Sequence, residues 1–387
     1  MTAGPSVMII AGEVSGDLLA GRLAQAIRRR HPEVGFFGIG GQELRNAGAE
    51  ILYDVNQTAV MGFTEVLARY PFFRRMFYRM LELARQRRPA AVILVDYPGF
   101  NMRFAARAHA MGLKVIYYVC PQVWAWNRGR IGAMARSVDR LICLFPFEPK
   151  AFDGTGLRVD FLGHPLVGTA RQVLAAPPAP LPWKGDPQVA VLPGSRAHEI
   201  RRILPVMWQA AGLLQKRYPS ASFLLAAPDA ATAGIGRACI RGIPAGPRQW
   251  DVAIGETRQV LRQARAAWVA SGTATLDATL MRCPFAIAYR VSWPTYVLGR
   301  MLVRVPYIGM VNLIAGRQVC PEFIQNQATP AALASALVPL IEDGAPRTAA
   351  LQGLDEVTEA LGAPGAEERA AEIVLAELGL NDPVRAG

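Results

Sequence analysis

The sequence predicts an α/β protein made of two doubly wound domains, each built on a parallel sheet. Short, wholly apolar runs alternate along the chain with longer segments of helical periodicity, a pattern typical of strands buried on both faces. The alternation stops at 175–187, a stretch with five prolines and no periodicity, and then starts again. The length of 387 residues suits two to three domains of about 150 residues each.

The first domain is expected over 1–174. An apolar run at 7–11 predicts its first strand, and a glycine-containing turn and a helix from about 17 to 30 follow. Further buried strands are expected at 34–39, 91–95, 115–119 and 140–145.

The segment 175–187 is interpreted as a stiff linker, and the second domain is expected over 188–345. Its strands are predicted at 189–193, 222–227, 266–270 and 284–289. The tail, 346–387, has a helical pattern and either packs back on the first domain or exchanges with a partner chain. Ligands of such sheets bind outside the carboxyl ends of the strands, so two facing sheets suggest one cleft between them.

Composition excludes a chain that is disordered throughout, because 52% of the residues are hydrophobic and only 19% are charged. The formal net charge is +12, and 38 of the 42 cations are arginine. An Arg-rich composition explains part of this charge. The alternatives are binding to nucleic acid, to anionic lipid or to phosphorylated substrates.

The cysteines and the termini indicate the compartment. Five cysteines, far apart and without a CxxC pair, fit neither a disulfide framework nor a zinc site and favour a reducing cytoplasm. The N-terminus lacks the pattern of a secretory signal, and no segment approaches the ~18 apolar residues of a membrane span. Contact with a membrane is therefore expected only from its surface.

Two turns in the second domain resemble phosphate sites. GSRAHEI at 194–200 follows a strand and opens a helix, where backbone N–H groups and the Arg196 guanidinium suit a phosphate or diphosphate. SGTATLD at 271–277 offers hydroxyls and amides at another helix start, with Asp277 placed to accept ribose hydroxyls. The alternative for each is an ordinary capped turn, but two in one domain favour a nucleotide diphosphate. Neither is a Walker P-loop.

The first domain carries carboxylates after two predicted strands. In VDYPGFN, Asp96 lies at a strand's carboxyl end, where it can act as a general base or simply cap the next helix. In GEVSGD, Glu13 and Asp17 can bind a hydroxylated ligand, or Asp17 can cap its own helix.

Aromatic and cationic residues gather in three further stretches. CPQVWAWNRGR suits sugar stacking or phosphate contacts, unless it is a structural tryptophan cluster. The stretch 69–88 is expected to form a helix with an aromatic face flanked by arginines on anionic lipid, or else a core helix with a solvated basic face. The stretch 292–309 is similar.

His164 is taken as structural, and no DxD, HExxH, GxSxG or clustered ligand pattern suggests a metal.

Nine blocks of sequence, in order from residue 11 to residue 325, resemble the lipid-A-disaccharide synthases. They are AGEVSGD, AVMGFTEVL, VDYPGFN, YYVCPQVWAWNRGR, LFPFE, FLGHPL, LPGSRAHEI, ASGTATLD and MVNLIAGRQVCPEFIQ. The resemblance implies a metal-independent, cofactor-free inverting glycosyltransferase with two facing Rossmann-like domains of GT-B type. Such an enzyme works at the cytoplasmic face of the inner membrane of a Gram-negative bacterium.

The implied reaction transfers 2,3-diacylglucosamine from its UDP donor to the 6-hydroxyl of 2,3-diacylglucosamine 1-phosphate. The products are the β-1′,6-linked disaccharide 1-phosphate and UDP. The same-class alternative is another UDP-sugar enzyme, such as a UDP-N-acetylglucosamine 2-epimerase. The alternative from another class is a nucleic-acid-binding protein, which only the net charge suggests.

The resemblance also implies site residues. Asp96, Arg196 and Asn312 are expected to be catalytic, with Asp96 as the base. The UDP-sugar is assigned to Gly194, Ser195, Arg196, Ser271, Gly272, Thr273, Asp277 and Glu322. The acceptor side is assigned to Glu13, Ser15, Asp17, Met61, Gly62, Trp124 and Trp126. Membrane contact is assigned to Phe72, Phe73, Arg74, Arg75, Phe77 and Tyr78, and a homodimer through the C-terminal tail is a further expectation. Asp277 stands where the family more usually has glutamate.

Overall fold

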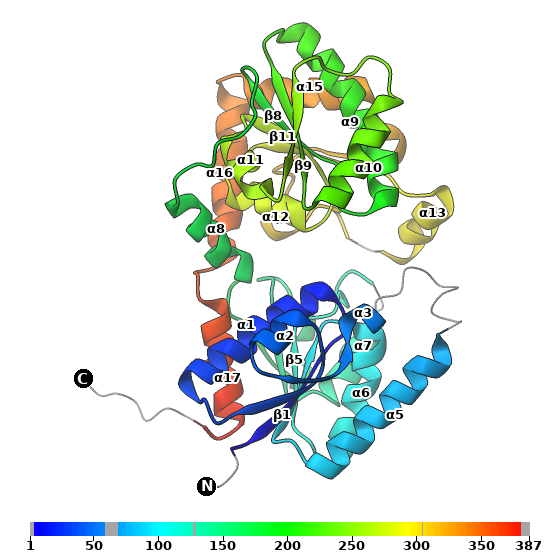
Figure 1. Ribbon diagram of the computed structural model, residues 1–387, viewed down its shortest axis with the longest axis vertical. Coiled ribbons are helices and arrows are strands. Elements are labelled where there is room, and N and C mark those ends of the chain that lie inside the picture. The colour runs from blue at the N-terminus through cyan, green and yellow to red at the C-terminus, as the bar shows by residue number, and fades with distance from the viewer. Residues whose placement is uncertain (1–3, 59–68, 127–128, 304, 381–387) are drawn as a thin grey trace, which may run out of the picture. The chain divides into compact units, whose positions relative to one another are not determined.

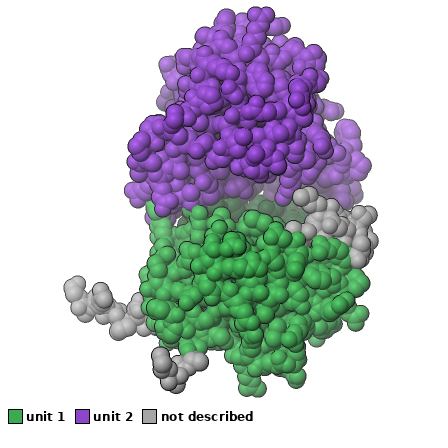
Figure 2. Space-filling model, in the orientation of Figure 1, with its two compact units in different colours: residues 1–165, 364–387 green, residues 166–363 purple. Residues whose placement is uncertain are grey.

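A computed structural model describes residues 4–58, 69–126, 129–303 and 305–380. The chain forms two compact units (Figures 1 and 2). Unit 1 comprises residues 1–165 and 364–387, and unit 2 comprises residues 166–363. The change of unit comes after Pro165, the first residue of helix α8 (Pro165–Ala175). The proline-rich segment after α8 bonds to unit 2, where Trp183 Nε1 donates to Gln263 Oε1 at 3.2 Å.

Unit 1 contains a seven-stranded, wholly parallel sheet in the order β3-β2-β1-β4-β5-β6-β7. The strands are β1 (Ser6–Ala11), β2 (Gly35–Gly40), β3 (Glu50–Asp54), β4 (Ala91–Val95), β5 (Val115–Tyr118), β6 (Arg140–Cys143) and β7 (Arg158–Phe161). The helices are α1 (Val14–Arg30), α2 (Gln42–Asn46), α3 (Val55–Thr58), α5 (Tyr70–Arg87), α6 (Pro98–Ala110), α7 (Gly129–Ala135), the 3₁₀ turn η1 (Pro149–Phe152) and α17 (Ala366–Glu377).

Both faces of this sheet are covered, as its apolar strands require. Along β1, Val7 and Ile9 pack into one core cluster with α1 and α17, whereas Met8 and Ile10 pack into another with α5 and α6. This alternation follows from the two-residue period of a strand.

Unit 2 contains a six-stranded parallel sheet in the order β10-β9-β8-β11-β12-β13. The strands are β8 (Gln188–Leu192), β9 (Ser222–Ala227), β10 (Trp250–Ile254), β11 (Ala266–Ala270), β12 (Phe285–Tyr289) and β13 (Glu322–Ile324). The helices are α8, α9 (Ala197–Arg217), α10 (Ala230–Arg241), α11 (Thr257–Gln263), α12 (Thr273–Leu280), α13 (Trp293–Leu302), α14 (Met310–Ala315), η2 (Gln325–Gln327), α15 (Pro330–Ile341) and α16 (Ala345–Ala360). Two doubly wound parallel sheets confirm the predicted fold class.

The C-terminal tail is helical and divides between the units. Helix α16 contacts α12 and α14 in unit 2, and α17 lies against α1 in unit 1 (Figure 1). The docking of α17 combines an apolar row that includes Val374 with ion pairs to α1, such as Arg30 to Glu372 at 2.6 Å. Within the described residues, no helix has the length and apolar character to cross a bilayer.

Candidate active site

The carboxylates of unit 1 lie where its strand order reverses. Strands β1 and β4 are neighbours, with Ala11 opposite Val95, and the later strands extend to opposite sides of this pair. The loop after β1 carries Glu13, and the loop after β4 carries Asp96. This is the edge at which doubly wound folds bind their ligands.

The backbone at Asp96 is held in an uncommon conformation. Asp96 and Tyr97 have φ values of 48° and 49°, in the left-handed region that non-glycine residues rarely adopt. The carbonyl oxygen of Asp96 accepts hydrogen bonds from Asn101 Nδ2 at 2.8 Å and from Tyr117 Oη at 2.7 Å. These buried side chains fix the loop, and such locally strained backbone clusters at functional sites.

The surroundings of Asp96 favour its protonated form. Burial, and secondly the Glu13 carboxylate, raise the pKa of Asp96 to about 6. The ring of Tyr97 covers the loop after β1 so closely that a Cβ at Gly12 would come within 2.3 Å of it. A carboxylate with a pKa near 6 is ionised at neutral pH and is a better proton acceptor than an ordinary aspartate.

Asp17 has a structural position. Its carboxylate is buried and accepts from the backbone N–H of Gly41 at 2.6 Å and of Glu43 at 3.0 Å, which joins α1 to the start of α2. The alternative that Asp17 caps its own helix is therefore wrong, because its carboxylate binds the backbone at the start of α2 instead. Ser15 is exposed, whereas Met61 and Gly62 lie outside the described residues.

The two tryptophans after β5 differ in their surroundings. Trp124 Nε1 donates to Glu148 Oε1 at 3.0 Å and its ring packs edge-on against Phe147. Trp126 is 39% exposed, with the Arg130 guanidinium 4.9 Å from its ring centroid. Trp124 is thus part of a structural cluster, whereas Trp126 is partly exposed and contacts the Arg130 guanidinium.

Glu148 is a buried carboxylate that was not predicted as a site residue. Burial raises its pKa to about 7, and burial also lowers the pKa of the nearby His164 to about 4. Ligand atoms of Glu148, Cys120 and Cys143 lie within 4.8 Å of one another, so the fold brings together cysteines that are distant in sequence. Both Glu148 oxygens already accept N–H groups, from Trp124 and from the backbone of residues 144 and 145.

The predicted diphosphate turn of unit 2 also lies where the strand order reverses, because β8 and β11 are neighbours. Gly194 adopts a φ of 108°, and Arg196 stands at the N-cap of α9 with a largely exposed side chain. Glu199 accepts at 3.3 Å from the backbone N–H groups of Ser195 and Arg196 and pairs with the Arg196 guanidinium at 3.4 Å. The Glu199 carboxylate thus accepts the hydrogen bonds of the N–H groups that are expected to bind a phosphate.

The second predicted turn follows β11. Gly272 and Thr273 are exposed at the start of α12, and Ser271 Oγ donates to the carbonyl oxygen of Ile308 at 3.0 Å. Asp277 pairs with Arg258 Nε at 2.7 Å. Burial raises the pKa of Asp277, although Arg258 opposes this shift.

Asn312 and Glu322 brace the loop beside this turn. The Nδ2 of Asn312, which is fully buried, donates to the Cys320 carbonyl at 2.7 Å and to Glu322 Oε1 at 2.8 Å, and its Oδ1 accepts from the amides of Val319 and Cys320. Glu322 accepts in addition from the backbone N–H groups of residues 308 and 309. The hydrogen-bonding capacity of the Asn312 side chain is therefore used within unit 2.

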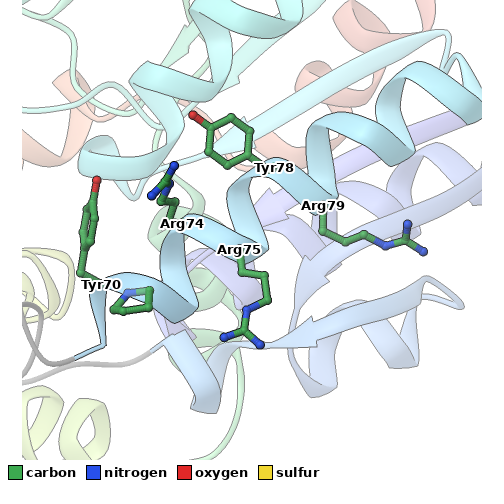
Figure 3. A pocket seen from close by; sticks show the side chains of 6 residues that line it. Tyr70, Arg74, Arg75, Tyr78 and Arg79 are labelled. Carbon is green, nitrogen blue, oxygen red and sulfur yellow. The ribbon is translucent and has the colours of Figure 1, made fainter.

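Helix α5 turns its phenylalanines inward. Phe72, Phe73 and Phe77 pack against the core cluster of unit 1, with Phe77 5.3 Å from the ring of Phe100. A surface hollow is lined instead by an exposed tyrosine and arginine face (Figure 3), made of Tyr70, Pro71, Arg74, Arg75, Tyr78 and Arg79. Periodicity predicted the helix but not the side that faces the core.

Comparison with known proteins agrees with this organisation. A family model described as Lipid-A-disaccharide synthetase matches residues 7–376. Lipid-A-disaccharide synthase from Anaeromyxobacter sp. (strain K) is 40% identical over 376 residues, which cover 95% of this chain and 96% of the relative. The synthase of Myxococcus xanthus (strain DK1622) is 40% identical over 383 residues, with 97% and 98% covered.

Solved structures share the fold at low sequence identity. A calicheamicin glycosyltransferase superposes with a TM-score of 0.62 at 15% identity, covering 97% of this chain and 98% of that chain. MurG of Acinetobacter baumannii gives 0.58 at 12%, covering 96% and 99%. UDP-GlcNAc 2-epimerase from Neisseria meningitidis bound to UDP-GlcNAc gives 0.58 at 11%, covering 97% and 100%. The fold is that of GT-B glycosyltransferases and related epimerases, and the sequence matches show that the chain belongs to the lipid-A-disaccharide synthetase family.

Proposed function

We propose that this glycosyltransferase of lipid A biosynthesis transfers 2,3-diacylglucosamine from its UDP donor to the 6-hydroxyl of 2,3-diacylglucosamine 1-phosphate. The products are the β-1′,6 disaccharide 1-phosphate and UDP. The observation that carries the proposal is the Asp96 loop. It is a strained turn at the carboxyl edge of the unit 1 sheet, and its carboxylate has a pKa of about 6. A family match over 7–376 supplies the substrate class.

Asp96 acts as the general base. Its carboxylate takes the proton of the acceptor 6-hydroxyl while that oxygen attacks the anomeric carbon of the donor. The bond between this carbon and the diphosphate breaks on the opposite face, UDP leaves, and the configuration inverts. Asn101 and Tyr117 act on Asp96 only through its carbonyl oxygen, so they are positioning residues.

Unit 2 binds the donor. The diphosphate contacts Arg196 and the amides of the 194–196 turn, and it displaces the Glu199 carboxylate from those amides. Thr273 and Gly272 extend the site, and the Asp277 carboxylate, held by Arg258, faces the ribose. Ser271, Asn312 and Glu322 keep the neighbouring loop in place and do not need to touch substrate.

The acceptor is assigned to exposed residues of unit 1, namely Glu13, Ser15 and Trp126. The arginine and tyrosine face of α5 contacts anionic lipid at the cytoplasmic surface of the inner membrane, from which both amphiphilic substrates come. Exchange of α17 between two copies would reproduce its contacts with α1 and is the proposed route to a homodimer.

The test is an assay of the purified chain with the diacylated UDP donor and the diacylated acceptor phosphate. We expect the disaccharide 1-phosphate and UDP in equal amounts. Conversion of UDP-N-acetylglucosamine to its 2-epimer, without transfer, would replace the proposal by the epimerase alternative that shares this fold. Steeply salt-dependent nucleic acid binding without transfer would favour the nucleic-acid alternative.

A further inference from the structure

Helix α13 of unit 2 presents an apolar surface to solvent. None of its ten residues is buried. Trp293 is 58% exposed, Leu298 57% and Met301 72%. Adjoining apolar side chains at Val297, Leu302 and Val303 are also exposed. Contiguous exposed apolar surface of this kind marks a site of interaction.

The apolar side chains form one continuous half of the helix. Trp293, Val297 and Met301 make one row four residues apart, and Pro294, Leu298 and Leu302 make the row beside it. Tyr296 and Gly299, on the opposite side, are half-buried. The helix is therefore amphipathic, but its apolar half faces solvent and not the core of the unit.

The positive charge of the sequence around α13 favours an anionic partner. Residues 278–321 contain no aspartate or glutamate, and they include arginines at 282, 290, 300, 304 and 317. Arg282 and Arg317 pair with Asp355 and Glu356 of α16, whereas Arg300 is exposed on α13 itself. An apolar helix with an aromatic start, an exposed arginine and no acids has the composition of helices that lie in a bilayer interface.

We infer that α13 is a second membrane-contacting element, whose apolar half inserts among the acyl chains of a bilayer that contains anionic lipid. Unit 2 then binds the membrane through α13, as unit 1 does through α5. Two weak contacts in one chain bind more tightly than either alone. The inference extends the proposed function, in which both substrates are amphiphiles, but its evidence is independent of the transfer reaction.

The experiment measures sedimentation of the full chain with vesicles of phosphatidylethanolamine and phosphatidylglycerol. In the test variant, Val297, Leu298 and Met301 are each changed to Ser. In the matched control, Leu174, Leu213 and Ile254, which are 44%, 40% and 45% exposed elsewhere in unit 2, are changed to Ser. We expect the test variant to lose about tenfold or more in partitioning and the control to keep its partitioning. Both should fold, because the changed side chains are exposed, and circular dichroism checks this.

Unchanged partitioning of the test variant would overturn the inference. Conversion of a dimer to a monomer in light scattering, with partitioning unchanged, would overturn it in favour of an interface between copies. A higher KM for the diacylated donor in detergent micelles, with partitioning unchanged, would assign the face to substrate acyl chains instead. Transfer by the unaltered chain is measured separately in micelles, so a failure of the proposed function is recognised independently of the vesicle result.

Discussion

Asp96 shows how the surroundings of a single residue change the proton affinity of its side chain. The residue lies in a left-handed turn that two side chains lock through its carbonyl, and burial together with Glu13 raises the pKa of its carboxyl to about 6. Burial disfavours the charged form, and a like charge nearby adds to this effect. The resulting carboxylate is ionised at neutral pH and is still basic enough to accept a proton.

This shift predicts the pH dependence of the reaction. Because the base must be ionised, kcat/KM should fall as the pH decreases through about 6. Glu13→Gln removes a neighbouring negative charge and lowers the pKa of Asp96, so this acid limb should move to lower pH. Glu82→Gln, on the exposed side of α5, is the control and should leave the limb in place. An unmoved limb in Glu13→Gln would show that the two carboxylates are not coupled.

Arg196 should contribute to nucleotide affinity. Arg196→Ala removes a charge-assisted contact to the diphosphate, so the Kd for UDP should rise about tenfold or more in calorimetry. Arg241→Ala, at the last turn of α10, removes an exposed arginine from the opposite edge of the sheet and should not change it. Equal Kd values for UDP in Arg196→Ala and the unaltered chain would show that Arg196 does not bind the nucleotide.

Asn312 is expected to act by positioning the loop. Asn312→Ala leaves the amides of Val319 and Cys320 without their buried acceptor, so the free energy of unfolding should fall by about 2–4 kcal/mol. UDP affinity should fall with it, and exposed Asn56→Ala should change neither. Full stability combined with lost turnover would instead place Asn312 in contact with substrate.

The elements of this fold were predictable where their strands are apolar on both faces. The runs at 7–11, 91–95, 189–193 and 266–270 correspond to β1, β4, β8 and β11, at the centres of the two sheets. The strands that were not predicted, β3, β7, β10 and β13, lie at the sheet edges, where half-exposed positions remove the apolar signal.

Side-chain roles were less predictable than strands. Asp17 binds a backbone N–H 24 residues away that only the tertiary structure brings near. Glu148, Glu199 and Asn312 bind backbone groups within eight residues, in contacts that the apolar pattern of the sequence does not indicate. The position of Asp96 at a strand's carboxyl end was visible in the sequence, because the strand before it is wholly apolar. Its left-handed backbone and its proximity to Glu13 depend on the neighbouring strand and could not be predicted.

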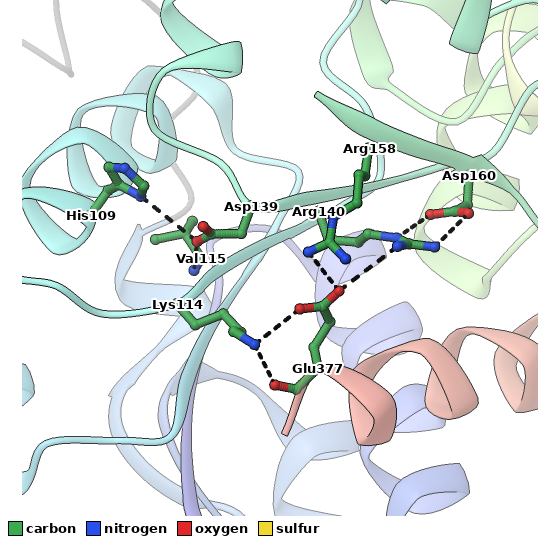
Figure 4. A network of polar contacts seen from close by, with 8 residues as sticks. All are labelled: His109, Lys114, Val115, Asp139, Arg140, Arg158, Asp160 and Glu377. Carbon is green, nitrogen blue, oxygen red and sulfur yellow. Dashed lines mark hydrogen bonds and ion pairs between the residues drawn. The ribbon is translucent and has the colours of Figure 1, made fainter. Parts of the chain in front are cut away.

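Helix α17 depends on a buried carboxylate for its docking. Glu377 contacts Lys114 Nζ at 3.0 Å and Arg158 Nη2 at 2.8 Å, within a network that reaches Arg140 and Asp160 (Figure 4). Burial alone would raise the pKa of Glu377, but the hydrogen bonds from Lys114 and Arg158 hold it below its usual value. The ionised form is therefore favoured by folding.

Glu377→Gln should lower the free energy of unfolding at pH 7 by about 1–3 kcal/mol in urea titrations. Because the pKa is lower in the folded state, this stabilisation is present above the unfolded value of about 4.3 and is lost as the pH falls below it. The difference between variant and unaltered chain should therefore shrink in acid. Glu372→Gln, in an exposed pair with Arg30, should cost less. A difference that does not depend on pH would contradict the role given to the ionised carboxylate.

The two units of the molecule place their candidate residues at the same point of a parallel sheet, but the residues differ in kind. Each unit places its candidate residues where the strand order of a parallel sheet reverses, with carboxylates in unit 1 and a helix N-terminus with arginine in unit 2. Arginines lie at the candidate diphosphate turn, on the α5 face and in the sequence around α13, so the net charge of +12 is consistent with the phosphorylated, membrane-derived substrates proposed above.

A single variant tests whether Asp96 is the base of a sugar transfer between diacylated substrates. In Asp96→Asn, which keeps the shape of the side chain but removes its basicity, turnover of the diacylated donor and acceptor should fall about 10²–10⁴-fold. The Kd for UDP, measured by calorimetry on the same protein, should stay within about twofold, because Asp96 belongs to unit 1 and the nucleotide turns belong to unit 2. Turnover close to that of the unaltered chain would show that Asp96 is not the base.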